Sequence, residues 1–95
     1  MAKIGLIDYG MGNLFSVQQA FKRVNQPLDI IRDIKSLRSC DALILPGVGA
    51  FDPAMTNLGK TDLIPSIIDW VNNGKPLLGI CLGLQLLFRV VMKAT

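Results

Sequence analysis

A cysteine stands between two glycines at the point where an aliphatic run gives way to a helical pattern. The sequence GICLG occupies residues 79–83 and places Cys81 at that junction. Small neighbours allow a nucleophile to occupy a sharp strand-to-helix turn, and a helix N-terminus favours the thiolate form. The backbone N–H of Leu82 would then point to where an oxyanion forms. The pattern predicts a cysteine nucleophile; the alternative is a buried structural cysteine beside packing glycines.

Two further features could complete such a site. The loop PGVG at residues 46–49 follows an aliphatic run, and its glycines free the backbone to donate a second N–H to the same oxyanion. An ordinary loop after a strand is the alternative. Gln85 lies one helical turn after Cys81 and therefore faces the same way. Its amide could orient a polar group of a ligand or only bond to the backbone.

The turn DYGMGN at residues 8–13 begins like a dinucleotide-binding fingerprint. Phe15 occupies the place of the third glycine and is too bulky for close packing of helix on strand. A tight turn at an interface is the better interpretation. The second cysteine, Cys40, precedes a strand without any such turn, and it is interpreted as structural.

The elements that must position these loops alternate between aliphatic runs and helical periodicity. Such alternation predicts an α/β fold, an open parallel sheet with helices on both faces, whose ligands bind at the carboxyl ends of the strands. All three glycine-containing loops fall at those ends. Strands are expected at Lys3–Asp8, Leu28–Arg32, Ala42–Leu45 and Pro76–Ile80, and helical segments at Leu14–Val24 (N-cap Asn13), Ser36–Ser39, Leu63–Val71 (N-cap Asp62) and Leu82–Val91.

Composition narrows the class of protein. The 95 residues are 51% hydrophobic and 18% charged with a net charge of +3, which indicates one core-rich domain or part of one. The basic residues are scattered, so nucleic-acid binding is disfavoured. The absence of histidine and of any CxxC spacing disfavours a zinc site. No apolar run approaches the ~20 residues of a membrane span, and Asp8 interrupts any signal peptide, so a cytoplasmic protein is expected.

Three segments together resemble a known family. They are IDYGMGNLFSV (7–17), LPGVGAFDPAMTNL (45–58) and GKPLLGICLGLQLLF (74–88). They are similar to the glutamine amidotransferase subunits of imidazole glycerol phosphate synthases, which are class I (triad-type) amidotransferases of histidine biosynthesis with a flavodoxin-like fold. GICLGxQ marks the wider superfamily, whereas DYGMGNL and PGVGAF are specific to this subunit. The resemblance covers about residues 3–89.

The resemblance implies a role for each loop. Cys81 would attack the side-chain amide of glutamine, form a glutamyl thioester and release ammonia. The partner would be a TIM-barrel synthase subunit that uses this ammonia to make imidazole glycerol phosphate. No metal or organic cofactor is implied. Backbone N–H groups at Val48, Gly49 and Leu82 would hold the oxyanion, Gly47 and Gln85 would line the glutamine pocket, and Gly10, Met11, Gly12 and Asn13 would face the synthase.

The sequence also departs from the family. The family's chain is about twice as long, with its catalytic histidine and orienting glutamate in the second half, and the tail Arg89–Thr95 lacks the usual polar, acidic continuation. Because the sequence contains no histidine, a Cys-His-Glu triad cannot exist within it. Residues 1–95 are therefore expected to be the N-terminal part of a single amidotransferase domain. Alone they should hydrolyse glutamine negligibly and expose apolar surface and a sheet edge.

A non-catalytic module is the alternative function. It would either bind the synthase or use Cys81 as a redox-sensitive thiol. Synthase binding predicts co-purification that persists after Cys81→Ala. Redox sensing predicts selective sulfenylation of Cys81 over Cys40.

Overall fold

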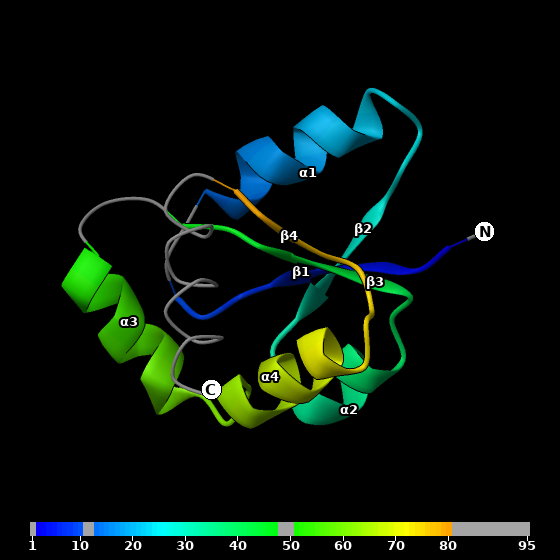
Figure 1. The fold of residues 1–95 in the computed structure, drawn as a ribbon. Helices are drawn as coiled ribbons and strands as arrows, with labels where there is room; N and C mark the ends of the chain where they lie inside the picture. Colours follow the sequence, from blue (N-terminus) through cyan, green and yellow to red (C-terminus); the bar gives the residue numbers. More distant parts are fainter. Residues whose placement is uncertain (1, 11–12, 48–50, 81–95) are drawn as a thin grey trace.

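A computed structural model describes residues 2–10, 13–47 and 51–80 of the chain. In this part, four parallel strands form one sheet in the order β2-β1-β3-β4, with helices on both faces (Figure 1). The predicted open parallel α/β sheet is therefore confirmed. The strands are β1 (Ile4–Ile7), β2 (Leu28–Ile31), β3 (Ala42–Leu45) and β4 (Leu77–Gly79), and the helices are α1 (Leu14–Lys22), α2 (Ile34–Arg38), α3 (Phe51–Lys60) and α4 (Ile64–Asn72).

The register of the sheet brings the ends of the strands together. Ile4 is aligned with Leu28 on one side and with Ala42 on the other, while Leu45 is aligned with Gly79. Since every pair is parallel, the carboxyl ends of all four strands lie at the same edge of the sheet. The segments that follow β1, β3 and β4 therefore emerge as neighbours.

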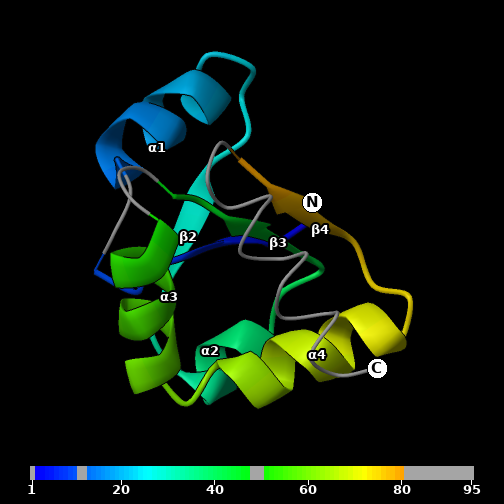
Figure 2. The same ribbon diagram turned by 60° about the vertical axis from the view of Figure 1, so that its left-hand side comes forward.

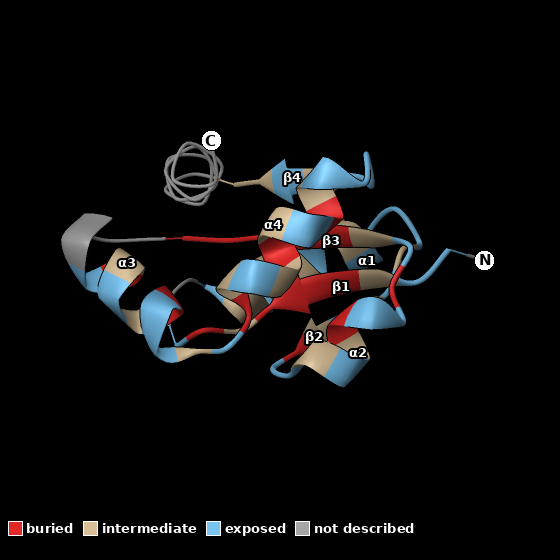
Figure 3. Cartoon of the chain, turned by 60° about the horizontal axis from the view of Figure 1, so that its bottom comes forward, coloured by how far each residue is buried: buried red, intermediate tan, exposed pale blue. Residues whose placement is uncertain are grey.

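The core lies between the sheet and one layer of helices. Among the described helices, α2, α3 and α4 cover one face, and α1 lies on the other (Figures 1 and 2). Strands β1 and β3 are aliphatic without alternation because both of their faces are covered, as is typical of parallel sheets. Figure 3 shows this burial on the inner faces of the helices and on the central strands. The cluster joins Ile7, Leu43 and Leu45 of the sheet to Leu37, Leu58, Ile67 and Trp70 of the helices.

The face under α1 is more open. No residue of α1 is buried, and Leu78 of the edge strand β4 is 51% exposed. Phe21, Ile44 and Leu78 line a shallow apolar groove of about 280 Å³ on this side. The expectation of exposed apolar surface is thus met in the described part of the chain.

Gly5 permits close packing of β1 against Ile31 and Cys40. A Cβ atom at this position would lie 2.6 Å from Cys40 Sγ and 2.6 Å from Ile31 Cγ1, closer than such atoms can approach. Cys40 itself is buried, and its thiol donates to the Ser36 carbonyl at 3.5 Å. Burial raises the pKa of this thiol, which keeps it in the unreactive neutral form. The interpretation of Cys40 as structural is confirmed.

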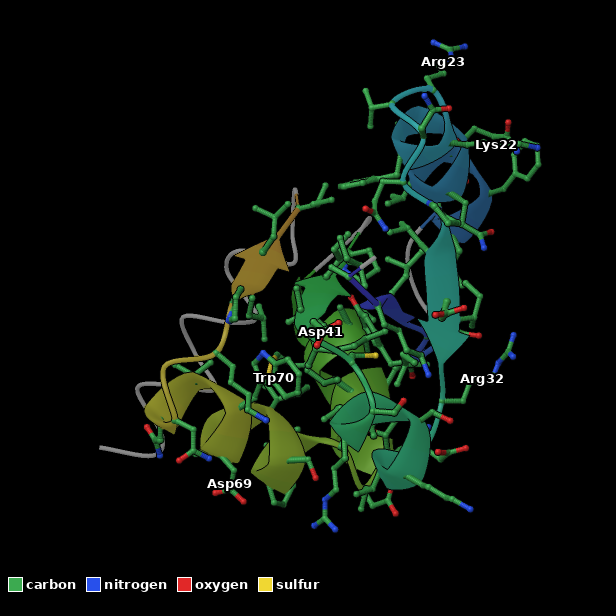
Figure 4. The ribbon with its side chains drawn as sticks, turned by 90° about the vertical axis from the view of Figure 1, so that its right-hand side faces the viewer. Lys22, Arg23, Arg32, Asp41, Asp69 and Trp70 are labelled. Carbon is green, nitrogen blue, oxygen red and sulfur yellow. The ribbon has the colours of Figure 1, made fainter. Side chains whose placement is uncertain are left out.

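Trp70 fastens α4 to the start of β4. Its indole Nε1–H donates to the Pro76 carbonyl at 2.8 Å, and Lys75 Nζ lies 4.7 Å from the centre of the ring. Figure 4 shows Trp70 directed toward the sheet, while the neighbouring Asp69 is directed away from it. A buried indole needs such a partner for its N–H, and this bond holds α4 against the residue that precedes β4.

One predicted helix N-cap is confirmed, and the starts of two other helices differ from the prediction. Asn13 accepts from the Ser16 N–H at 3.1 Å, so the predicted N-cap of α1 is confirmed. Helix α2 begins earlier than predicted because Asp33 caps it, accepting from the Ser36 N–H at 2.7 Å. The predicted cap at Asp62 is wrong. Leu63 holds the N-cap position of α4, and the Thr61 hydroxyl accepts its N–H.

Helix α3 is absent from the elements that the sequence predicts. Pro53 and Gly59 both lower helix propensity and obscure the periodicity. Pro53 lies in the first turn, where its missing N–H removes no helical bond. Ala54 and Leu58 are one turn apart and fully buried, so tertiary packing forms this helix.

The capping carboxylate of α2 predicts a pH dependence of stability. The Ser36 N–H lowers the pKa of Asp33 below its ordinary value of 3.8. The resulting stabilisation of the folded state is fully present when the pH is above the ordinary pKa of Asp33. It is lost as the pH falls through the lowered pKa that Asp33 has in the folded state. Asp33→Asn keeps an oxygen acceptor but carries no titrating group. Urea midpoints measured from about pH 7 to about pH 2 should therefore fall less steeply for Asp33→Asn than for the parent protein. Parallel curves would contradict this assignment.

Candidate functional site

The candidate site is the edge where the carboxyl ends of β1, β3 and β4 meet. The Ile80 N–H donates to the Leu45 carbonyl at 3.0 Å, so pairing between β3 and β4 continues one residue beyond Gly79. Cys81 is the next residue in the sequence. The described chain therefore ends at Ile80, directly beside the end of β3 and one position before Cys81 in the sequence.

The loop after β3 starts inside the protein. Pro46 and Gly47 are both buried, which is uncommon for a loop and requires their backbone groups to find partners. The Pro46 carbonyl has one, described below. Gly47 lies just past the end of β3, the central strand that pairs with β4.

The loop after β1 is held by its own carboxylate. Asp8 Oδ1 accepts from the Gly10 N–H at 3.1 Å, and Asp8 Oδ2 accepts from Arg32 Nε at 2.8 Å. Gly10 has φ of 86°, a conformation that other residues rarely adopt. Gly10 and Asn13 are exposed, whereas Tyr9 between Asp8 and Gly10 is buried. This turn therefore has an anchored inner part and an accessible outer part.

Tyr9 connects the two loops. Its hydroxyl donates to the Pro46 carbonyl at 2.6 Å, and only 4% of the residue is exposed. Burial raises the pKa of this phenol to about 12, so it remains a hydrogen-bond donor at neutral pH. Sequence reasoning assigned Tyr9 no role. The available indication was a tyrosine directly after an aliphatic strand, whose hydroxyl needs a hydrogen-bond partner if the ring is buried.

The predicted site residues divide into two sets. Gly10 and Asn13 lie on the loop after β1, and Gly47 lies at the end of β3, so the fold brings these two loops to one edge. The other predicted residues, Met11, Gly12, Val48, Gly49, Cys81, Leu82 and Gln85, lie outside the described residues, as does the predicted helix Leu82–Val91.

Three further observations concern residues 2–10, 13–47 and 51–80. This part contains no group of three or more His, Cys, Asp or Glu side chains placed to hold a metal ion. None of its helices is long and apolar enough to cross a membrane. The basic side chains are exposed and dispersed: Figure 4 shows Lys22 and Arg23 at the far end of α1, well away from Arg32.

Comparison with known proteins agrees with this arrangement. A family model described as "Glutamine amidotransferase class-I" matches residues 5–95. The protein named imidazole glycerol phosphate synthase subunit HisH from Prochlorococcus marinus (strain NATL2A) is 83% identical over the whole chain, which covers 46% of that protein. A subunit of the same name from Synechococcus sp. (strain CC9902) is 60% identical over 90% of the chain and 40% of its own length. The chain thus spans less than half the length of these relatives.

Proposed function

Since the chain belongs to the class-I glutamine amidotransferase family, we propose that it supplies the nucleophile-bearing half of a glutaminase. This glutaminase is the subunit of imidazole glycerol phosphate synthase that provides ammonia for histidine biosynthesis. The observation that carries the proposal is the edge where β1, β3 and β4 end together. The loops after β1 and β3 start at this edge, and the pairing of Ile80 with Leu45 brings the chain to the same edge one position before Cys81 in the sequence.

The proposed reaction is acyl transfer through a thioester. The Cys81 thiolate attacks the carboxamide carbon of glutamine, and the carbonyl oxygen becomes an oxyanion that the N–H groups of Val48, Gly49 and Leu82 hold. The C–N bond then breaks as the nitrogen takes up a proton, and ammonia leaves a glutamyl thioester. Attack by water releases glutamate and restores the thiol.

The proton transfers need a base that this sequence lacks. The chain contains no histidine, so we place the base in the part of the relatives that the chain does not span. Gly47 and Gln85 are proposed to line the glutamine pocket. The burial of Gly47 at the end of β3 supports this role, because a substrate bound there would be shielded from water.

The proposed partner is a TIM-barrel cyclase subunit that receives the ammonia, in a cytoplasmic heterodimer. The outer part of the loop after β1, residues 10–13, is proposed as the contact. Gly10 and Asn13 support this because both are exposed, while Asp8 and Tyr9 anchor the same loop to the sheet. An accessible turn on a rigid base is suited to docking a partner.

The test uses a hybrid protein. Residues 1–95 replace the region they match in the NATL2A relative, so that the hybrid has a complete domain. We expect the hybrid to release glutamate from glutamine, faster when the cyclase subunit is present. We also expect a chloroketone analogue of glutamine to alkylate Cys81, seen as a mass shift on its tryptic peptide.

Two controls define the outcome. Cys40→Ala should leave alkylation of the hybrid unchanged, because Cys40 is buried and its neutral thiol is unreactive. The 95-residue chain alone should show no turnover, since it has no histidine. A folded hybrid that neither hydrolyses glutamine nor reacts at Cys81 would refute the proposed function.

A further inference from the structure

We propose that Tyr9 is a positioning residue of the glutaminase site, one that fixes the Pro46–Gly47 peptide and ties it to the exposed loop after β1. The inference rests on the proposed function, because it assigns Gly47 to the glutamine pocket. It assigns a role to Tyr9, a residue that takes no direct part in the proposed acyl transfer.

The first step is the contact itself. Tyr9 directly follows Asp8 at the end of β1, and Pro46 directly follows β3, so a single hydrogen bond spans the ends of two neighbouring strands. The bond is short, at 2.6 Å from hydroxyl to carbonyl oxygen, and both residues are buried. Water cannot readily replace the phenol there, so loss of the hydroxyl would leave the Pro46 carbonyl unsatisfied.

The second step concerns the peptide plane. The Pro46 carbonyl and the Gly47 N–H belong to the same rigid, planar unit. A bond that fixes the direction of the carbonyl therefore also fixes the direction of the N–H. Glycine has the widest backbone freedom of any residue, so the Gly47 backbone needs such an external restraint more than another residue would.

The third step concerns how the loop after β1 is held in place. Asp8 binds the Gly10 N–H through one oxygen and Arg32 through the other, and its own N–H donates to the Ile31 carbonyl at 2.8 Å. Residues 8–10 are therefore held as one unit. A partner that displaced Gly10 would move Tyr9 with it, and Tyr9 would transmit the movement to the Pro46–Gly47 peptide.

The experiment compares two hydroxyl deletions in the hybrid protein. Tyr9→Phe removes the phenol oxygen and keeps the ring. Thr61→Val is the matched control, because the Thr61 hydroxyl donates to the Leu58 carbonyl at 2.6 Å in the connection between α3 and α4. Each hybrid is assayed for glutaminase kcat and KM with the cyclase subunit, and for hydrogen–deuterium exchange of the peptide containing Gly47.

We expect Tyr9→Phe to lower the partner-stimulated kcat by about tenfold, with less than about a twofold change in KM for glutamine. Exchange at the Gly47 amide should quicken by about tenfold, in line with the loss of one buried hydrogen bond. Thr61→Val should change neither quantity. Loss of activity that is equal in both variants would assign Tyr9 a general stability role and overturn the inference.

The exchange measurement separates this inference from the proposed function. If the unsubstituted hybrid hydrolyses glutamine but Tyr9→Phe matches it in kcat and exchange, the inference alone fails. If the unsubstituted hybrid is inactive, the proposed function fails. Unchanged amide exchange in Tyr9→Phe would then still contradict the restraint of the Pro46–Gly47 peptide by Tyr9. Faster exchange confined to Tyr9→Phe supports this restraint in either case.

Discussion

Replacement of Cys81 by alanine in the hybrid protein is expected to lower glutamine hydrolysis by at least about 10³-fold. The physical reason is that the proposed thioester cannot form without the sulfur. Water at the same position is a far weaker nucleophile, and the proposed oxyanion donors cannot compensate for the missing thiolate. The measurement is glutamate release at saturating glutamine, with the cyclase subunit present.

The Cys81→Ala hybrid also supplies its own control. If the cyclase subunit consumes ammonia, added ammonium salt should restore product formation to the level of the unsubstituted complex, because external ammonia bypasses the thioester. Cys40→Ala should retain glutamine-dependent activity. Hydrolysis by Cys81→Ala at more than about a tenth of the parental rate would exclude a cysteine nucleophile at this position.

The second large effect is expected at Gly5. Gly5→Ala places a methyl group 2.6 Å from both Cys40 Sγ and Ile31 Cγ1, inside a central strand that cannot easily shift. Overpacking of this kind costs about 1–3 kcal/mol of unfolding free energy. The measurement is the urea midpoint of the hybrid protein at neutral pH, taken with the m-value to confirm that only stability has changed.

Two substitutions test the cause of that loss. Gly59→Ala makes the same chemical change in α3, where an added Cβ meets nothing within 4 Å, so it should stabilise by about 0.5–1 kcal/mol. Adding Cys40→Ala to Gly5→Ala removes one of the two atoms that clash, and the double variant should lose less stability than the two single losses combined. A Gly5→Ala midpoint equal to that of the parent protein would contradict the packing described here.

Much of the fold follows from local patterns. The aliphatic run Ala42–Leu45 is a strand with the predicted bounds, and the helical period after Asn13 begins where the cap predicts. Helix α3 could not be predicted in the same way, because Pro53 and Gly59 weaken its propensity while distant contacts of Ala54 and Leu58 stabilise it. Asp62 resembles a cap in sequence, yet Leu63 holds the N-cap position of α4, and the Thr61 hydroxyl accepts the Leu63 N–H.

The candidate site likewise has one part that could be predicted from the sequence and another that could not. Glycine loops after aliphatic strands could be assigned to one edge from sequence, since parallel strands bring their carboxyl ends together. Tyr9 could not be assigned, because its acceptor on Pro46 lies 37 positions away and only the pairing of β1 with β3 brings the two residues into contact. Contacts between loops depend on strand order, which no local pattern contains.

The anchoring of Trp70 to Pro76 has an optical consequence. Trp70 is the single tryptophan of these 95 residues, so their entire indole emission arises from one buried ring beside Lys75. Detachment of β4 from α4 would expose this ring to water and shift its emission to the red. Within this chain, intrinsic fluorescence therefore reports on the docking of the strand that leads to Cys81, without any added dye.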